Sequence, residues 1–217
     1  LKATEPEIPF KQTMARVLQA VKTIEPHDSV ERYTGLGVDV VEGYAKIIDP
    51  WTVEIARHDG ETQRLTTRSI VIAAGAEPFV PPIDGLADVD FLTSDTMWDA
   101  FAQMDAAPKR VAVLGGGPIG CELSQALSRL GSNVTQIERS DWVLGREDVE
   151  VSDLAKQALE ASGVTVLTRH NAVRVEQGAI IVEHDGQEKN IEFDVLLVAV
   201  GRAARLTGYG LEDLGID

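Results

Sequence analysis

A glycine pattern in the middle of the chain constrains the fold more than any other feature of the sequence. Gly115, Gly117 and Gly120 stand in the order GxGxxG, directly after the apolar run VAVL and before a segment with helical spacing. Gly115 permits a tight turn from strand to helix, Gly117 allows close approach of a pyrophosphate, and Gly120 lets the helix pack closely on the strand. The pattern therefore predicts a strand–turn–helix unit that binds a dinucleotide.

The residues around these glycines support the same prediction. Pro118 falls in the first helical turn, where its missing N–H costs little and the other free N–H groups face a phosphate. A second apolar run ends at Glu138, whose carboxylate is placed to accept both hydroxyls of an adenosine ribose. The same carboxylate would repel a 2′-phosphate, which favours NAD(H) over NADP(H). Arg139 and Arg146 stand close by, either as recruiters of a phosphate or as ordinary solvated side chains.

Strand and helix patterns alternate through the second half of the chain. Buried apolar strands are expected at 110–114, 133–137, 164–167 and 195–200, and helices at 118–130 and 149–162. This alternation predicts right-handed βαβ units and an α/β fold with a doubly wound, Rossmann-like parallel sheet. Three further runs, at 172–176, 179–184 and 188–193, predict an antiparallel insert.

The first half of the chain has a different pattern. Apolar residues at helical spacing predict a helix at 14–24, and Asp28 or Ser29 can cap a short second one. Short strands follow as a β-meander at 38–41, 45–48, 52–56 and 64–67, and then a buried strand is expected in SIVIAAG, residues 69–75. The Pro-rich segment EPFVPPIDG follows as an expected linker, and it places a domain boundary at about residues 84–92.

Charge and cysteine content exclude several functions. The 217 residues carry a formal net charge of −15, so a nucleic acid or an anionic membrane is a poor electrostatic partner. Cys121 is the one cysteine, which excludes an internal disulfide, a dithiol redox pair and a thiolate-rich metal site. No metal site is expected. No membrane span or signal peptide is recognisable, so the chain is expected to be soluble and cytoplasmic.

Several segments, in order, resemble the flavin-dependent pyridine nucleotide-disulfide oxidoreductases, above all the dihydrolipoamide dehydrogenase and mercuric reductase branch. The segments are SIVIAAGAEPFVPPIDG, TSDTMWDA, LGGGPIGCELSQALSRLGSNVTQIER and FDVLLVAVGRAARLTGYGLEDLGID, and DSVERYTGLGVDVVEGYAKIIDPWTVEI precedes them. The resemblance implies that residues 1–88 belong to an FAD domain, 89–203 form the NAD(H)-binding domain, and 204–217 return toward the FAD domain.

The resemblance also implies roles for particular residues. Ile119 matches a position beside the nicotinamide, with a core position as the alternative. Glu122 matches a glutamate near the contact of nicotinamide and flavin, with stabilisation of the helix start as the alternative. Gly201 lies where the family's chain passes the bound dinucleotide, and Gly75 ends the strand that resembles one of the FAD domain. Ala204 and Arg205 replace the family's Pro and Asn after Gly201.

Other family features are missing from the chain. Neither an N-terminal GxGxxG nor a CxxxxC redox pair is present, and no C-terminal dimerisation domain follows. The chain is therefore expected to be a fragment that binds NAD(H) but lacks reductase activity. Its expected partners are the FAD and dimerisation domains of its parent and the parent's small-molecule substrate. Strand edges at 38–67 are expected to pair two copies into a homodimer. The alternatives are a non-catalytic dinucleotide-binding or sensing module and a self-contained NAD-dependent dehydrogenase.

Overall fold

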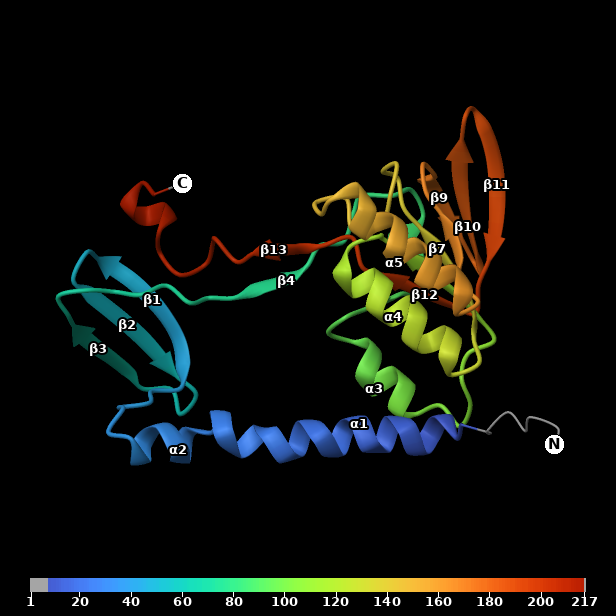
Figure 1. Ribbon diagram of the computed structural model, residues 1–217. Helices are drawn as coiled ribbons and strands as arrows, with labels where there is room; N and C mark the ends of the chain where they lie inside the picture. Colours follow the sequence, from blue (N-terminus) through green and yellow to red (C-terminus); the bar gives the residue numbers. More distant parts are fainter. Residues whose placement is uncertain (1–7, 217) are drawn as a thin grey trace. The chain divides into compact units, whose positions relative to one another are not determined.

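Two compact units make up the chain. The computed structural model describes residues 8–216. One unit contains the chain up to Gln19 together with Pro78–Arg202, and the other contains Ala20–Glu77 and the segment after Arg202. The chain passes between the units within α1 (Phe10–Ile24), at β4 (Ala76–Pro78) and at β13 (Arg202–Ala204), and β4 pairs with β13 (Figure 1). The assignment of residues 1–88 to an FAD domain concerns a larger assembly and stays a prediction.

A five-stranded parallel sheet is the centre of the first unit. Its order is β5-β12-β6-β7-β8, and all neighbouring strands in it are parallel. Helix α4 connects β6 to β7, and helix α5 connects β7 to β8. These are the βαβ units that the sequence predicts, so the Rossmann-like α/β fold is confirmed. The bounds are β5 Leu92–Thr93, β6 Arg110–Leu114, α4 Pro118–Arg129, β7 Asn133–Ile137, α5 Val149–Ala161, β8 Thr165–Leu167 and β12 Val195–Val198.

Both faces of this sheet are buried, which explains its continuous apolar strands. Along β6, Val111 and Val113 face one hydrophobic cluster, while Ala112 and Leu114 face another. The first cluster includes Leu127 and other residues of α4 and α5, as well as α3 (Met97–Ala102). The start of α1 joins the same cluster, where the rings of Phe10 and Phe101 pack edge to face at 5.8 Å.

The second cluster lies under the predicted antiparallel insert. Strands β9 (Asn171–Glu176), β10 (Ala179–His184) and β11 (Gln187–Glu192) form a three-stranded sheet in the order β11-β10-β9. Ile180 and Val182 of β10 are fully buried against β6 and β12 residues of this cluster. The parallel sheet is thus covered by helices on one face and by a small sheet on the other.

The second unit contains the β-meander of the sequence prediction. Strands β1 (Gly43–Asp49), β2 (Thr52–Arg57) and β3 (Thr62–Thr66) are antiparallel neighbours in that order. After α1 comes a short 3₁₀ turn, and then α2 (Val30–Gly35), which Ser29 caps by accepting a hydrogen bond from the Arg32 backbone N–H. Tyr209 of the C-terminal segment accepts a backbone hydrogen bond from Ile47 of β1 at 2.8 Å.

Two strand predictions are wrong. Residues 69–75 carry no strand, and Val71 within them is 89% exposed. Residues 38–41 also carry none, because β1 begins only at Gly43. A parallel strand needs hydrogen-bonding neighbours, and in residues 8–216 no strand pairs with 69–75. The apolar run therefore forms no strand and is largely exposed to solvent in this structure. No helix within the described part of the chain is long and apolar enough to span a membrane.

Candidate functional site

The glycine pattern lies where the order of the parallel sheet reverses. The chain runs outward from β6 through β7 to β8, whereas β12 returns to pair with β6 on the other side. Open α/β sheets bind ligands at the carboxyl ends of their strands at such a reversal. Gly115 follows β6 at this end, donating its N–H to Ile137 O at 2.8 Å, and Ala199 after β12 donates to Leu114 O at 2.8 Å.

The glycines of this loop differ sharply in the space around them. A Cβ added to Gly115, which has a φ of +120°, would lie 2.3 Å from Ala199 O, and one on Gly120 would lie 2.2 Å from Gly115 O. A Cβ on Gly116 would lie 2.8 Å from two Glu138 side-chain atoms. A Cβ on Gly117 would meet nothing within 4 Å. Three glycines are therefore needed for packing within the loop, whereas Gly117 leaves an open side.

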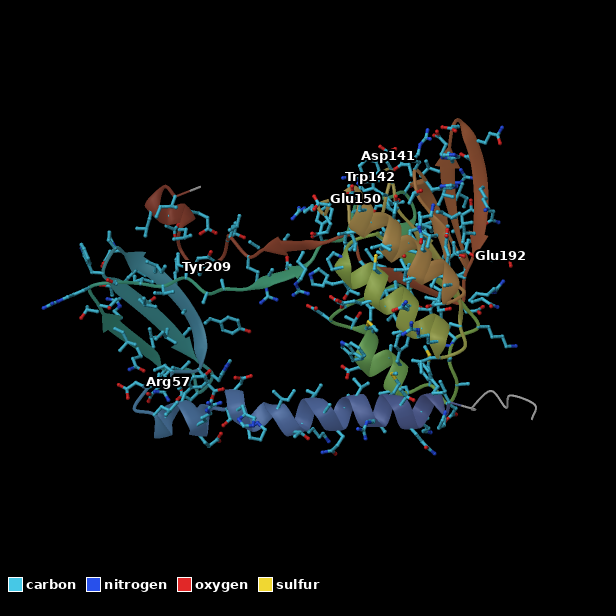
Figure 2. The ribbon with its side chains drawn as sticks, in the orientation of Figure 1. Arg57, Asp141, Trp142, Glu150, Glu192 and Tyr209 are labelled. Carbon is cyan, nitrogen blue, oxygen red and sulfur yellow. The ribbon has the colours of Figure 1, made fainter. Side chains whose placement is uncertain are left out.

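The start of α4 faces the same open side with unpaired donors. Gly117 is the N-cap and Pro118 opens the helix; no side chain caps it, and its first turn holds no acid. The first N–H groups of a helix have no intrahelical partner, and the helix dipole adds partial positive charge there. By contrast, α5 begins with Glu150 in its first turn. Figure 2 labels Glu150 of α5, together with Asp141 and Trp142 of the loop that leads into this helix.

Glu138 is fixed beside the loop by two backbone donors. Its Oε2 accepts from Gly116 N at 2.6 Å, and its Oε1 accepts from Ser140 N at 2.7 Å. Its own backbone is held as well, because Glu138 N donates to Leu167 O at 2.8 Å and His170 N donates to Glu138 O at 3.0 Å. A carboxylate has about four lone-pair positions. Each oxygen of this half-buried group therefore retains acceptor capacity.

The loop after Glu138 closes against the glycine loop. Leu144 donates its N–H to Gly116 O at 2.7 Å and has a φ of +53°, uncommon for a residue with a side chain. Arg169 N donates to Ser140 O at 2.9 Å from the segment after β8. Backbone contacts from two directions thus hold the residues around Glu138 in place.

Two side chains contact the glycine loop from the α4 face of the sheet. Gln136 of β7 is fully buried, and its Nε2 donates to Gly115 O at 3.0 Å and lies 3.5 Å from Cys121 Sγ. The Cys121 thiol in turn lies 3.5 Å from Gly116 O. Burial raises the pKa of Cys121, so the thiol form is favoured. Cys121 therefore acts here as a packing residue and weak donor.

The remaining predicted site residues divide into three groups. Ile119 packs against the helix-side cluster, and Glu122 and Arg139 are exposed. Gly201 is exposed two residues beyond Ala199, and its carbonyl accepts from Phe79 N at 3.0 Å. Gly75 belongs to the other unit, where its carbonyl accepts from Arg205 N at 3.1 Å. The structure thus brings Gly115, Gly117, Gly120, Pro118, Ile119 and Glu138 together around the start of α4. The roles of Gly201 and Gly75 in cofactor binding stay predictions.

Sequence reasoning missed three residues of the site. Gly116 and Ser140 bind Glu138 through backbone N–H groups, which leave no side-chain signal in a sequence. Gln136 does leave a signal, because it is a polar residue inside the apolar run NVTQI just before the acid. Polar residues at buried strand positions are uncommon unless hydrogen-bonded, so the signal could have been used.

Similar proteins include mercuric reductases and dihydrolipoyl dehydrogenases. A mercuric reductase from Staphylococcus aureus is 35% identical over 193 residues, which cover 87% of this chain and 33% of that protein. A dihydrolipoyl dehydrogenase from Pseudomonas aeruginosa is 34% identical, over 95% of this chain and 46% of its own. The structure of LpdA from Mycobacterium tuberculosis matches with a TM-score of 0.78 at 26% identity, over 98% of this chain and 47% of that one.

The chain thus spans a third to a half of the length of these relatives. The fold alone is shared with a flavoprotein disulfide reductase from Escherichia coli, at a TM-score of 0.77 and 24% identity. The sequence profile described as pyridine nucleotide-disulphide oxidoreductase matches residues 3–217. The resemblance seen in the sequence motifs is confirmed: the chain belongs to the pyridine nucleotide-disulphide oxidoreductase family.

Proposed function

We propose that this chain is the NAD(H)-binding part of a flavoprotein that passes hydride from NADH to FAD and then to a redox disulfide. The observation that carries the proposal is the contrast within the glycine loop. Gly115, Gly116 and Gly120 are packed tightly, while Gly117 opens onto the uncapped start of α4. A phosphate needs such an approach to free backbone N–H groups.

Glu138 supports NAD(H) rather than NADP(H). Its carboxylate is held at 2.6 and 2.7 Å by two backbone donors and retains acceptor positions for the two ribose hydroxyls. A 2′-phosphate in the same place would bring two negative charges together, which is unfavourable. Arg139 is the neighbouring cation that would moderate this preference.

The nicotinamide end of the site is proposed from the family resemblance. Ile119, Glu122 and Gly201 would lie along the bound dinucleotide, and the tight β6–β12 contact at Gly115 would set the path between them. When bound, NADH supplies a hydride, and the protein orients the cofactor. The residues of this chain would bind the pyrophosphate, hold the ribose and fix the dinucleotide's direction.

The wider setting is also part of the proposal. FAD would bind to a domain that includes Gly75, and the final acceptor would be a small molecule of the longer protein. The FAD and dimerisation domains would be this chain's partners, in a cytoplasmic enzyme. A homodimer through the edges of the β1–β3 sheet stays a prediction, which light scattering would test.

Titration with NADH tests the proposed function directly. NADH fluorescence or calorimetry should detect binding at one site per chain, with weaker binding of NADPH. Gly117→Val should abolish NADH binding while leaving the unfolding transition unchanged, because the added side chain enters open space on the phosphate side. Gly35→Val is the matched control, since its Cβ would also meet nothing within 4 Å. Equal binding by both variants would contradict the proposal.

An activity assay separates the alternatives. The isolated chain should bind NADH without oxidising it in the presence of a disulfide acceptor. Turnover of NAD with an alcohol or hydroxy acid would instead indicate a self-contained dehydrogenase. Failure to bind either nucleotide would contradict every form of the dinucleotide proposal.

A further inference from the structure

A fully buried amide lies behind the glycine loop, at a position where packing alone favours an apolar side chain. Gln136 is the one polar residue among the largest fully buried side chains of residues 8–216. It shares the helix-facing side of β7 with Val134, and its register partner on β6 is Val113. Its neighbours in this layer are therefore hydrocarbon, apart from the start of α4.

The amide is only half satisfied. Its Nε2 has two partners, Gly115 O at 3.0 Å and Cys121 Sγ at 3.5 Å. Its Oε1 is buried without a hydrogen-bond partner. An orphaned buried acceptor is unfavourable, so a methionine of similar length would suit a packing role better. Positions that break such local rules are often functional.

The contact with Gly115 fixes the direction of a peptide group. The C=O of Gly115 and the N–H of Gly116 belong to one planar trans unit, so they point in opposite directions. The carbonyl is held by Gln136 Nε2, and the N–H donates to Glu138 Oε2 at 2.6 Å. One peptide group therefore connects the buried amide of Gln136 to the carboxylate of Glu138.

The next peptide group is held in the same manner. Gly116 O accepts from Leu144 N at 2.7 Å and lies 3.5 Å from the Cys121 thiol. The N–H of Gly117 must then point away from these groups. Rotation of the first peptide is resisted by Gln136 of β7, and rotation of the second by Leu144 of the loop after Glu138.

We propose that Gln136 is a positioning residue for dinucleotide binding: its amide locks the Gly115–Gly116 peptide so that Glu138 is held ready for the adenosine ribose. This inference rests on the proposed function. Gln136 does not touch the dinucleotide and acts through the loop. Cys121 is a weaker second support, because a thiol is a poor donor.

The test is the substitution Gln136→Met in the full chain. NADH affinity should fall about tenfold, the effect of losing roughly one hydrogen bond of about 1.4 kcal/mol. The urea midpoint should change little, because removal of the orphaned Oε1 offsets the loss of the Nε2 hydrogen bond to Gly115 O. Gln125→Met is the matched control: its Nε2 binds Ala158 O and Ser162 Oγ, at 3.3 and 3.0 Å, and its NADH affinity should not change.

Two further measurements distinguish positioning from a merely structural role. In the free protein, amide hydrogen exchange at Gly116 should become faster in Gln136→Met and stay unchanged in Gln125→Met. In a Glu138→Gln background, Gln136→Met should cost little further NADH affinity, because both act through one contact. Additive losses in the double variant would overturn the proposal. Gln136→Leu repeats the test should the methionine variant fold poorly.

The outcomes also separate this inference from the proposed function. Wild-type chain that binds NADH, with Gln136→Met binding equally well, would overturn the inference alone. Loss of affinity together with a lower urea midpoint and unchanged Gly116 exchange would mean that Gln136 is only structural. Wild-type chain that does not bind NADH would overturn both.

Discussion

Two apolar runs in this chain have almost the same sequence, but only one of them forms a strand. Residues 70–75 read IVIAAG and residues 196–201 read LLVAVG, and each ends in a glycine with positive φ. Leu197 in the second run is 0% exposed, with β5 and β6 paired on either side of its strand. Val71 in the first is 89% exposed and lies in no strand. Apolar sequence makes a strand feasible, and paired neighbours on both sides make it form.

The largest test of this comparison is truncation of one side chain in each run. Leu197→Ala should lower the free energy of unfolding by about 2–5 kcal/mol, because it leaves a cavity between sheet and helices. Val71→Ala should change it by less than about 0.5 kcal/mol. Urea denaturation followed by circular dichroism measures both. Similar losses in the two variants would show that 69–75 is packed in solution, and the comparison would fail.

A second test compares two glycines that follow apolar runs. Gly115→Ala should cost about 1–3 kcal/mol from overpacking against Ala199 O, in addition to strain at its φ of +120°, and NADH binding should be lost. Gly75→Ala has φ strain alone, about 1–2 kcal/mol, because its Cβ would meet nothing within 4 Å. Thermal unfolding and NADH titration would check the two variants, and NADH binding that survives in Gly115→Ala would contradict the tight contact.

A third, smaller contrast is between two acidic residues, one beside the parallel sheet and one after residues 69–75. Glu138 directly follows β7, and Glu77 lies two residues after Gly75. Glu138→Gln should weaken NADH binding about tenfold, or about 1.4 kcal/mol, and narrow its advantage over NADPH. Glu77→Gln should leave both affinities unchanged. Calorimetric titration of each variant with NADH and with NADPH shows whether Glu138 discriminates between an unmodified ribose and a 2′-phosphate.

The smallest effect concerns pH. Asp194 lies just before β12, and its carboxylate accepts from the Arg110 side chain and from Arg110 N at 2.9 Å. The Arg110 side chain holds the pKa of Asp194 below its usual range. Arg110 at the start of β6 also pairs with Glu192, which Figure 2 places in β11.

A carboxylate whose pKa is lowered by folding adds stability above its unfolded pKa, and that stability is lost as pH falls through the folded value. In Asp194→Asn the free energy of unfolding should therefore depend less on pH below about pH 4, which is near the ordinary pKa of an aspartate. Arg68→Gln, just before residues 69–75, should leave the pH dependence of stability at acid pH unchanged. Unfolding midpoints measured between neutral and acid pH would reveal the difference, and parallel curves for wild type and Asp194→Asn would contradict it.

Much of the first unit could be predicted because its signals are local. The GxGxxG turn, the helix from Pro118, the strand ending at Ile137 and the three-stranded insert all depend on short patterns. The strand at 69–75 failed because strand formation depends on partners, which a local pattern does not contain. Ser140 was missed because its backbone N–H contacts Glu138 only in the folded loop. Gln136 left a signal as a polar residue within an apolar run, but its contact with Gly115 is created only by the fold.

The uneven space around the loop glycines has an evolutionary consequence. Among sequences selected only to fold and express, Gly115 and Gly120 would persist, because an added methyl group would collide with backbone at 2.3 and 2.2 Å. Gly117 would drift first, since a side chain there meets nothing within 4 Å. In a lineage that kept the fold but no longer bound a nucleotide, Gly117 would thus be substituted long before the residues of the sheet.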